Sequence, residues 1–282
     1  MPTTDTRLPS PEVCARVALA TAGLGGNRHI GAAIRDRGSA VDLVAAAYDN
    51  DPFLELPADI STRLRALGGG HTVAAVLEIT IQRGYRILTP GHDEWPAQVE
   101  VLGTAAPVAL WASGSGAALH DLPVVVTGST CPDPWLRHDV IDLTTRIAGD
   151  GWTVATAARP GVDNLAHQST LAMDAPLVTV ATTAREGHAR GEVVISENPP
   201  LLPVVLASAL RTPVILAALA GKVLVAGGEA GSGAMRTGIA AHALARPLGV
   251  VGGSEGRAGG NRLQEQFGAP LIQTLAEVER LV

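Results

Sequence analysis

Apolar residues recur at helical spacing through the first part of the chain. An Ala- and Val-rich run over residues 13–22 leads to the turn Gly23-Leu24-Gly25-Gly26 and then to a second stretch with apolar residues three and four positions apart. Similar patterns cover residues 40–48, 59–67 and 72–83. The pattern therefore predicts a small helical domain over residues 1–82, of the SAM-like or helix-hairpin-helix-like kind.

The glycine-rich turn allows two interpretations. A helix, glycine turn and helix can present backbone N–H groups to a DNA phosphate, because glycine lets the backbone approach closely. A tight turn between two packed helices needs the same glycines. We favour the structural interpretation, since such turns are common.

The pattern changes after residue 83. Residues 83–105 read as a linker or extension that contains a short strand and a turn. From residue 106 to 282, apolar runs that predict strands alternate with amphipathic runs that predict helices. Continuous apolar strands separated by helices are typical of a parallel sheet buried on both faces, so this part predicts one α/β domain. In such sheets ligands bind beyond the carboxyl ends of the strands.

Composition narrows the classes of function. The 32 glycines, against two Phe and two Tyr, favour tight turns and close backbone approach to phosphate over aromatic base stacking. The net charge of −6 gives no overall positive field, so nucleic-acid binding would need a local basic patch.

Cysteine usage and hydropathy bear on the compartment and on cofactors. Cys14 and Cys131 lie far apart without metal-ligand spacing, which suits a reducing compartment and predicts no zinc and no other cofactor. The first residues do not read as a signal peptide, and no run reaches the roughly 18 apolar residues of a membrane span. We expect a cytoplasmic protein that does not enter a membrane.

The first strand-end loop contains Gly128, Ser129 and Thr130 and precedes a helix. Glycine permits close approach, the two hydroxyls can donate to phosphate oxygens, and the helix N-terminus adds partial positive charge. The loop lacks the G-x-G-x-x-G fingerprint, which disfavours nicotinamide redox chemistry.

A second loop contains Arg159 and Gly161 and leads into a helix. Asp163 and His167 lie one turn apart on the same face of this helix. Asp163 can also serve simply as a helix cap, and the sequence leaves both roles open.

The loop with the composition best suited to an anion contains Gly231, Ser232 and Gly233. It opens a helix that carries Arg236 and Thr237 in its first turn. A flexible connector is the alternative, but a helix start at a strand end rarely goes unused in this architecture.

Two further loops supply weaker candidates. Ser196 and Glu197 end a strand just before two prolines, where they can face a ligand hydroxyl or cap a turn. Asn261 and Arg262 follow a Gly-Gly pair before the last long helix, and Arg262 either completes a phosphate clamp or lies along the surface.

Taken in order and spacing, these loops resemble the DNA-processing protein family known as DprA or Smf. The family pattern is a GSR-type loop, an SGLARGID…AH segment, a strand ending in SE-PP, an RNRIIAGLS helix, an SGS…T loop and a final GTNRLI…GA. The matching segments here are GST at 128–130, TAARPGVDNLAH at 156–167, SENPP at 196–200, AGSGAMRT at 230–237 and GGNRLQEQFGA at 259–269. Five segments in register identify the chain as a divergent member.

The resemblance implies a Rossmann-like domain over residues 106–282, with helices on both faces of its sheet. It also implies binding of single-stranded DNA, help in loading the recombinase RecA during DNA uptake or recombination, and a homodimer. Some relatives carry a winged-helix domain after this one, and we expect it to be absent after Val282.

Departures from the family pattern weaken the expectation of tight DNA binding. Thr130 replaces the arginine of the first loop, Pro160 stands at a second arginine position beside Arg159, and the basic helix reads RTPVILAAL from Arg211. Each lost phosphate contact removes roughly one unit of salt dependence and the affinity that accompanies it.

Two functions therefore stay open. The first is a non-enzymatic, DprA-like protein that binds single-stranded DNA through its glycine loops and nearby arginines. The second is a sensor or hydrolase for a nucleotide-derived ligand, in which Glu197, or Asp163 with His167, would be the acid and base groups. The loss of arginines with retention of glycines favours the second, whereas the motif order favours the first, which we take as the primary hypothesis.

Overall fold

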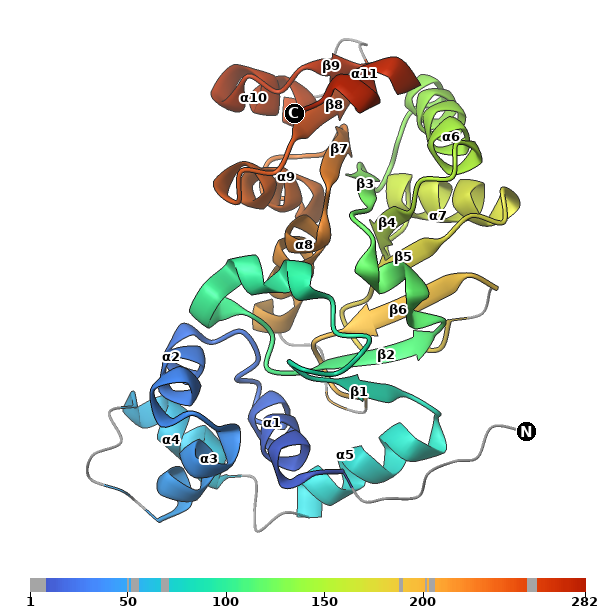
Figure 1. Ribbon diagram of the computed structural model, residues 1–282. Coiled ribbons are helices and arrows are strands. Elements are labelled where there is room, and N and C mark those ends of the chain that lie inside the picture. The colour runs from blue at the N-terminus through green and yellow to red at the C-terminus, as the bar shows by residue number, and fades with distance from the viewer. Residues whose placement is uncertain are drawn as a thin grey trace.

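The N-terminal unit is helical, as the sequence predicts (Figure 1). The computed structural model describes residues 9–49, 51, 56–66, 71–187, 190–200, 202, 206–252 and 258–282. In this part of the chain the unit consists of α1 (Pro11–Thr21), α2 (Arg28–Arg37), α3 (Ala40–Tyr48), α4 (Ala58–Arg65) and α5 (His71–Gln82). Ser10, Asn27 and Ser39 accept hydrogen bonds from the first-turn amides of α1, α2 and α3, and so fix where these helices begin.

One sheet organises the rest of the molecule. Its strand order is β1-β2-β6-β5-β4-β3-β7-β8-β9. The strands are β1 (Arg86–Leu88), β2 (Leu110–Gly114), β3 (Val124–Gly128), β4 (Val154–Ala157), β5 (Leu177–Val180), β6 (Glu192–Ser196), β7 (Lys222–Ala226), β8 (Leu248–Val251) and β9 (Leu271–Ile272). Strands β3 to β9 pair in parallel, which confirms the predicted parallel α/β core.

The edge of the sheet next to the helical unit differs from the prediction. Strands β1 and β2 pair with each other and with β6 in antiparallel fashion, so the sheet is mixed. Residues 83–105, which we predicted as a linker, contribute β1 and a 3-10 segment, η1 (Ala97–Ala105). Two short strands that turn back along an edge do not produce the long apolar run that marks a buried parallel strand.

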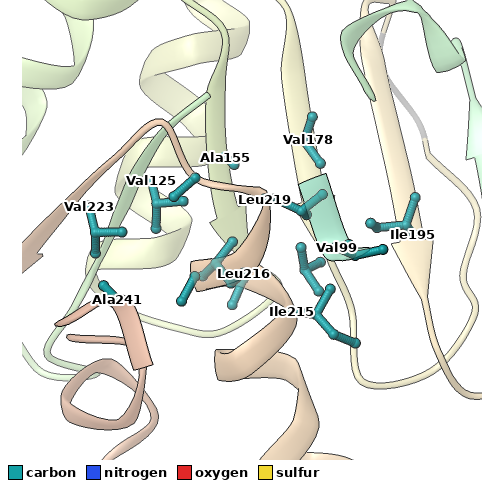
Figure 2. Close-up of a cluster of buried hydrophobic side chains, with 14 of the residues drawn as sticks. Val99, Val125, Ala155, Val178, Ile195, Ile215, Leu216, Leu219, Val223 and Ala241 are labelled. Atoms are coloured by element: carbon teal, nitrogen blue, oxygen red, sulfur yellow. The ribbon is translucent and has the colours of Figure 1, made fainter. Parts of the chain in front are cut away.

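Helices cover both faces of the sheet, as expected for a Rossmann-like fold. On one face lie α6 (Pro134–Gly149), α7 (Val162–Ala172) and α11 (Leu275–Arg280), and on the other lie α8 (Leu206–Leu219), α9 (Gly233–Ala243) and α10 (Ala258–Phe267) (Figure 1). Figure 2 shows the core on the second face, where Val125, Ala155 and Val178 of the sheet pack against Leu216 and Leu219 of α8. These side chains are fully or almost fully buried.

One helix begins earlier than predicted. The segment that contains Asn261 and Arg262 lies inside α10, which starts at Ala258, and not in a loop before it. Glycine at two positions of a first turn weakens the sequence signal for a helix but does not prevent one.

Chain direction around β3 marks the natural ligand position of this fold. From β3 the chain passes through α6 to β4 on one side, whereas β7 lies on the other side of β3, with α9 on the opposite face. The carboxyl ends of β3 and β7 therefore form a topological switch point, where open α/β sheets bind their ligands.

The helical unit packs onto β1 and β2. Trp111 of β2 is almost fully buried in the apolar cluster of this unit, and its Nε1 donates to Oγ1 of Thr80 on α5 at 3.1 Å. Among the described residues, none of the helices combines the length and the apolar character needed to cross a bilayer.

Candidate functional site

Three glycine-containing loops after adjacent strands meet at one rim of the sheet, and two of them open directly into helices. Gly128 ends β3 and leads toward α6, Gly161 is the N-cap of α7 after β4, and Gly233 opens α9 after β7. Since β4, β3 and β7 are parallel neighbours, their carboxyl ends lie side by side. The structure thus brings together the loops that the sequence singled out for phosphate binding.

Glycine is required at two of these positions by the packing of one loop on another. Gly161 has a φ of +79°, and a methyl group there would overlap the carbonyl of Ser129 and the backbone of Thr130. A methyl group on Gly128 would overlap the carbonyl of Ala226 in β7. The amide of Val162 donates to Ser129 O at 2.9 Å, so the loop after β3 and the start of α7 are joined directly.

The first loop leaves little of Ser129 for a ligand. Its amide donates to Ala226 O at 3.0 Å, and its hydroxyl accepts from the amide of Cys131 at 3.1 Å. Thr130, in the position of the family arginine, is exposed. Of the three residues predicted in this loop, Thr130 is therefore the most accessible side chain.

A buried carboxylate lies beneath the rim. Asp163 is fully buried, and its Oδ1 accepts from the hydroxyl of Thr127 at 2.7 Å and from that of Thr156 at 3.2 Å. Nε of Arg159 lies 2.9 Å from Oδ2, close enough for an ion pair although the N–H does not point along the line between them. Asp163 therefore anchors Arg159 and is not itself open to a ligand.

Burial raises the pKa of Asp163, because a carboxylate loses its hydration inside the fold. The positive charge of Arg159 and the hydrogen bonds from Thr127 and Ala157 oppose this shift but are weaker than burial. The charged form of Asp163 is therefore less favourable in the folded chain than in water.

Arg159 reaches from this carboxylate to the start of α9. A methyl group on Gly233 would overlap its guanidinium group, so glycine at that position makes room for the arginine. The side chain of Arg159 is 26% exposed, and its Nη2 donates to Thr127 Oγ1 at 2.6 Å. One guanidinium group therefore links the starts of α7 and α9 while still facing solvent.

The start of α9 offers a second cation. Arg236 is exposed and its Nε donates to Gly231 O at 3.2 Å. The hydroxyl of Ser232 caps the helix by accepting from the amide of Met235, and Thr237 is buried and donates to Gly233 O at 3.0 Å. Of the predicted side chains here, only Arg236 is free to meet an anion.

A cleft of about 320 Å³ joins these groups. We call it the α9 cleft; its lining includes Arg159, Thr182, Leu210, Gly231, Gly233 and Arg236. Two guanidinium groups beside a helix N-terminus give it the charge and the donors of an anion site.

Ser196 and Glu197 lie in a different setting. The hydroxyl of Ser196 is buried and closes a turn with the backbone of Asn198. Glu197 is also buried, and its two oxygens accept from Nε and Nη2 of Arg211 at 2.8 and 3.0 Å. Both residues shape the strand end, and neither lines the α9 cleft.

The three candidate acid and base groups do not converge. Asp163 is paired with Arg159, Glu197 with Arg211, and His167 with Glu192, whose Oε1 lies 2.9 Å from the Nε2 of the histidine. The predicted pair of Asp163 and His167 therefore has separate partners, and the arrangement does not form an acid–base couple. Arg262 is exposed on α10, and the side chain of Asn261 lies outside the described residues.

Sequence reasoning missed several residues that pair with the predicted ones or lie beside them, namely Thr127, Arg185, Glu192 and Arg211. A signal was present for two of them, because Thr127 and Glu192 are polar residues inside apolar strands. Such residues need buried partners, which suggests that they hold neighbouring functional side chains in place.

Known proteins share both this fold and parts of this sequence. A DNA processing protein DprA of Mycobacterium tuberculosis is 28% identical over 235 residues, which are 73% of this chain and 60% of that relative. The chain thus spans about 60% of the length of this curated relative.

Two solved structures share the fold. DNA processing protein A from Streptococcus pneumoniae superposes with a TM-score of 0.74 at 19% identity, covering 93% of this chain and 95% of that one. DNA processing protein A from Helicobacter pylori, in a structure reported for its single-stranded DNA binding mode, gives a TM-score of 0.61 at 19% identity, covering 70% and 94%.

The family model fits the part of the chain that forms the sheet and the rim. The model of DNA recombination-mediator protein A matches residues 86–281, from β1 through α11, and so includes every loop described above. With the motif order, the fold and this match in agreement, the chain belongs to the DNA recombination-mediator protein A family, as the resemblance to DprA predicted.

Proposed function

We propose that this protein binds single-stranded DNA across the carboxyl rim of its sheet and acts without enzymatic activity in DNA processing and recombination. The observation that carries the proposal is the meeting of three glycine-containing loops at adjacent strand ends, two of them at the N-termini of α7 and α9, with Arg159 partly exposed and Arg236 exposed beside them. Backbone amides, helix dipoles and guanidinium groups bind phosphate without regard to base sequence.

The comparisons support the choice of ligand. The family is named for mediating recombination, and the related Helicobacter protein is described by its binding of single-stranded DNA. The recombinase loaded onto such DNA would be RecA, and the binding form would be a homodimer in the cytoplasm. Light scattering tests whether the protein is a homodimer, and a pull-down tests whether it binds RecA.

Affinity should be modest, because few cations remain at the rim. Thr130 brings no charge, and Arg211 is engaged with Glu197 and with Ala105 O. Binding would therefore rest on a small number of phosphate contacts and weaken steeply with salt.

The test is fluorescence anisotropy with a labelled oligothymidylate across a salt series, on the wild type and on Arg236→Ala. We expect binding at low salt, a linear fall of log affinity with log salt, and a loss of about tenfold in Arg236→Ala, since one phosphate contact is removed. Arg280→Ala, on α11 away from the rim, is the matched control and should bind like the wild type. Absence of wild-type binding at low salt, together with thermal stabilisation by mononucleotides, would replace DNA by a small nucleotide ligand.

A further inference from the structure

The connection from β5 to β6 leaves part of one sheet face without a covering helix. Its described residues, 181–187 and 190–191, contain no helix, and α7 covers only the neighbouring strands of that face (Figure 1). A groove of about 760 Å³ lies between α7 and this connection. We call it the α7 groove; it has the size of sites that hold a nucleotide-sized ligand.

A buried carboxylate, that of Glu192, lies at the floor of the α7 groove and already has partners inside the protein. Glu192 is only 2% exposed, and its Oε1 accepts from the hydroxyl of Thr179 at 2.9 Å and meets His167 Nε2 at 2.9 Å. The negative charge therefore lies deep and is partly compensated. It presents little repulsion to an anion at the mouth.

The mouth of the groove carries positive charge. Arg185 is 39% exposed, and its nearest guanidinium nitrogen is 3.9 Å from Glu192, a loose pairing that leaves the side chain partly open to solvent. Arg159 lines the other side of the mouth. Both side chains are partly open to solvent, at 26% for Arg159 and 39% for Arg185, and a guanidinium group in such a setting can donate to phosphate oxygens.

The wall formed by α7 offers neutral hydrogen-bonding groups. Asn164 and Gln168 lie one turn apart, both exposed and both lining the groove. Amide side chains donate and accept at the same time, so they can bond to the edge of any base. This wall suits a base without selecting one.

Arg159 also lines the α9 cleft, so the two hollows share one guanidinium group. We propose that the α7 groove is a second nucleotide subsite for the same DNA strand, which crosses the rim from the α9 cleft over Arg159. Arg159 and Arg185 contact phosphates of the strand at the two hollows, and a base enters the groove against Asn164 and Gln168. This inference rests on the proposed function.

The test compares a short and a long probe, oligothymidylates of about four and about twelve nucleotides. Arg185→Ala removes the outer cation. The double variant Asn164→Asp with Gln168→Glu instead places two negative charges on the wall while keeping side-chain shape. Arg185→Lys keeps the charge, and Arg146→Ala, on an exposed ion pair of α6, controls for the loss of an arginine elsewhere.

We expect Arg185→Ala and the double variant to weaken binding of the long probe about tenfold and to leave the short probe unchanged. The salt slope for the long probe should fall by roughly 0.7 in Arg185→Ala, the value for one phosphate of a single strand. Arg185→Lys should recover most of the affinity, and Arg146→Ala should bind like the wild type.

Unchanged binding of the long probe in both groove variants would overturn the subsite. So would an equal loss for the two probes, which would indicate a general electrostatic or folding effect. If the wild type binds neither probe at low salt, the proposed function itself fails, and this outcome is distinguishable from a failure of the subsite alone.

Discussion

Arg159 lies over the buried carboxylate of Asp163 and beside the first residue of α9, and Thr127 of β3 bonds to both charged groups. Three elements that are distant in sequence are thus joined by one side-chain network around the guanidinium group of Arg159. Because Asp163 is fully buried, its charge is tolerated only while Arg159 and the hydroxyl groups stay in place.

The raised pKa of Asp163 makes a pH-dependent prediction. The folded-state pKa lies above the unfolded value of about 3.9, so the contribution of this carboxyl to stability is complete below that value and is lost as pH rises through the folded pKa. Relative to Asp163→Asn, which does not titrate, the wild type should lose free energy of unfolding as pH rises from about 4 toward neutral, by up to about 1.4 kcal/mol per pH unit within the window.

Urea unfolding of both proteins at a series of pH values measures this difference. A wild type that gains stability over Asp163→Asn with rising pH would contradict the assignment. It would show that Arg159 and the hydroxyl groups outweigh the cost of burial.

Single residues were predictable from the sequence where their role is local. Gly161 and Gly233 lie at strand-to-helix turns, and their position in the motif order placed them correctly at one rim. The burial of Glu197 in an ion pair was not predictable. Its partner is Arg211 of α8, and the sequence alone does not show that α8 packs against this strand end. Whether the predicted side chains bind DNA stays a prediction.

At the level of elements, the start of α7 is positioned by its packing against the loop after β3. The loop after β3 and the start of α7 are in backbone contact, with Val162 N donating to Ser129 O. The parallel strands and their helices were predictable from apolar runs, and strands were also expected close to β1 and β2, but the antiparallel pairing of these two strands at the edge of the sheet was not predicted. Their pairing is decided by the helical unit that covers them, through contacts such as that of Trp111 with Thr80.

The loop contact predicts that Gly161→Ala lowers the free energy of unfolding more than Gly151→Ala does. Both glycines have positive φ, so both substitutions carry a backbone cost of about 1–2 kcal/mol. At Gly151 a methyl group meets nothing within 4 Å, whereas at Gly161 it overlaps the backbone of Ser129 and Thr130. We expect an additional cost of about 1–3 kcal/mol at Gly161 from overpacking.

Urea unfolding at neutral pH compares the two variants directly. Equal losses at the two glycines would mean that the loops around Ser129 can move apart freely. The close contact between the loop after β3 and the start of α7 would then not be a structural requirement.

At the level of the whole molecule, an ion pair holds the helical unit against the sheet. Arg211 bonds to both oxygens of Glu197 and donates to Ala105 O at 2.9 Å. The turn between α1 and α2 lies on this pair, because methyl groups on Gly25 and Gly26 would crowd Glu197 and overlap Arg211. The glycine-rich turn therefore allows the helical unit to pack closely against Glu197 and Arg211, in keeping with the structural interpretation favoured from the sequence.

Replacing Arg211 should weaken the contact between the helical unit and the sheet. Arg211→Ala leaves the buried Glu197 without its counter-ion, and we expect a loss of about 3 kcal/mol in the free energy of unfolding. Hydrogen exchange should rise most in α1 and α2, which lie next to the ion pair. Arg146→Ala, whose ion pair is fully exposed, should unfold like the wild type, and a similar loss in that control would refute the proposed role of Arg211.

Hydrogen exchange with and without a saturating oligothymidylate tests the central claim most directly, because it reports which backbone amides the DNA covers. We expect protection at residues 128–131, 158–164 and 231–237, the three glycine-containing loops of the carboxyl rim. Protection confined to the turn between α1 and α2, or to the opposite rim, where Lys222 begins β7 and donates to Leu281 O, would contradict this claim.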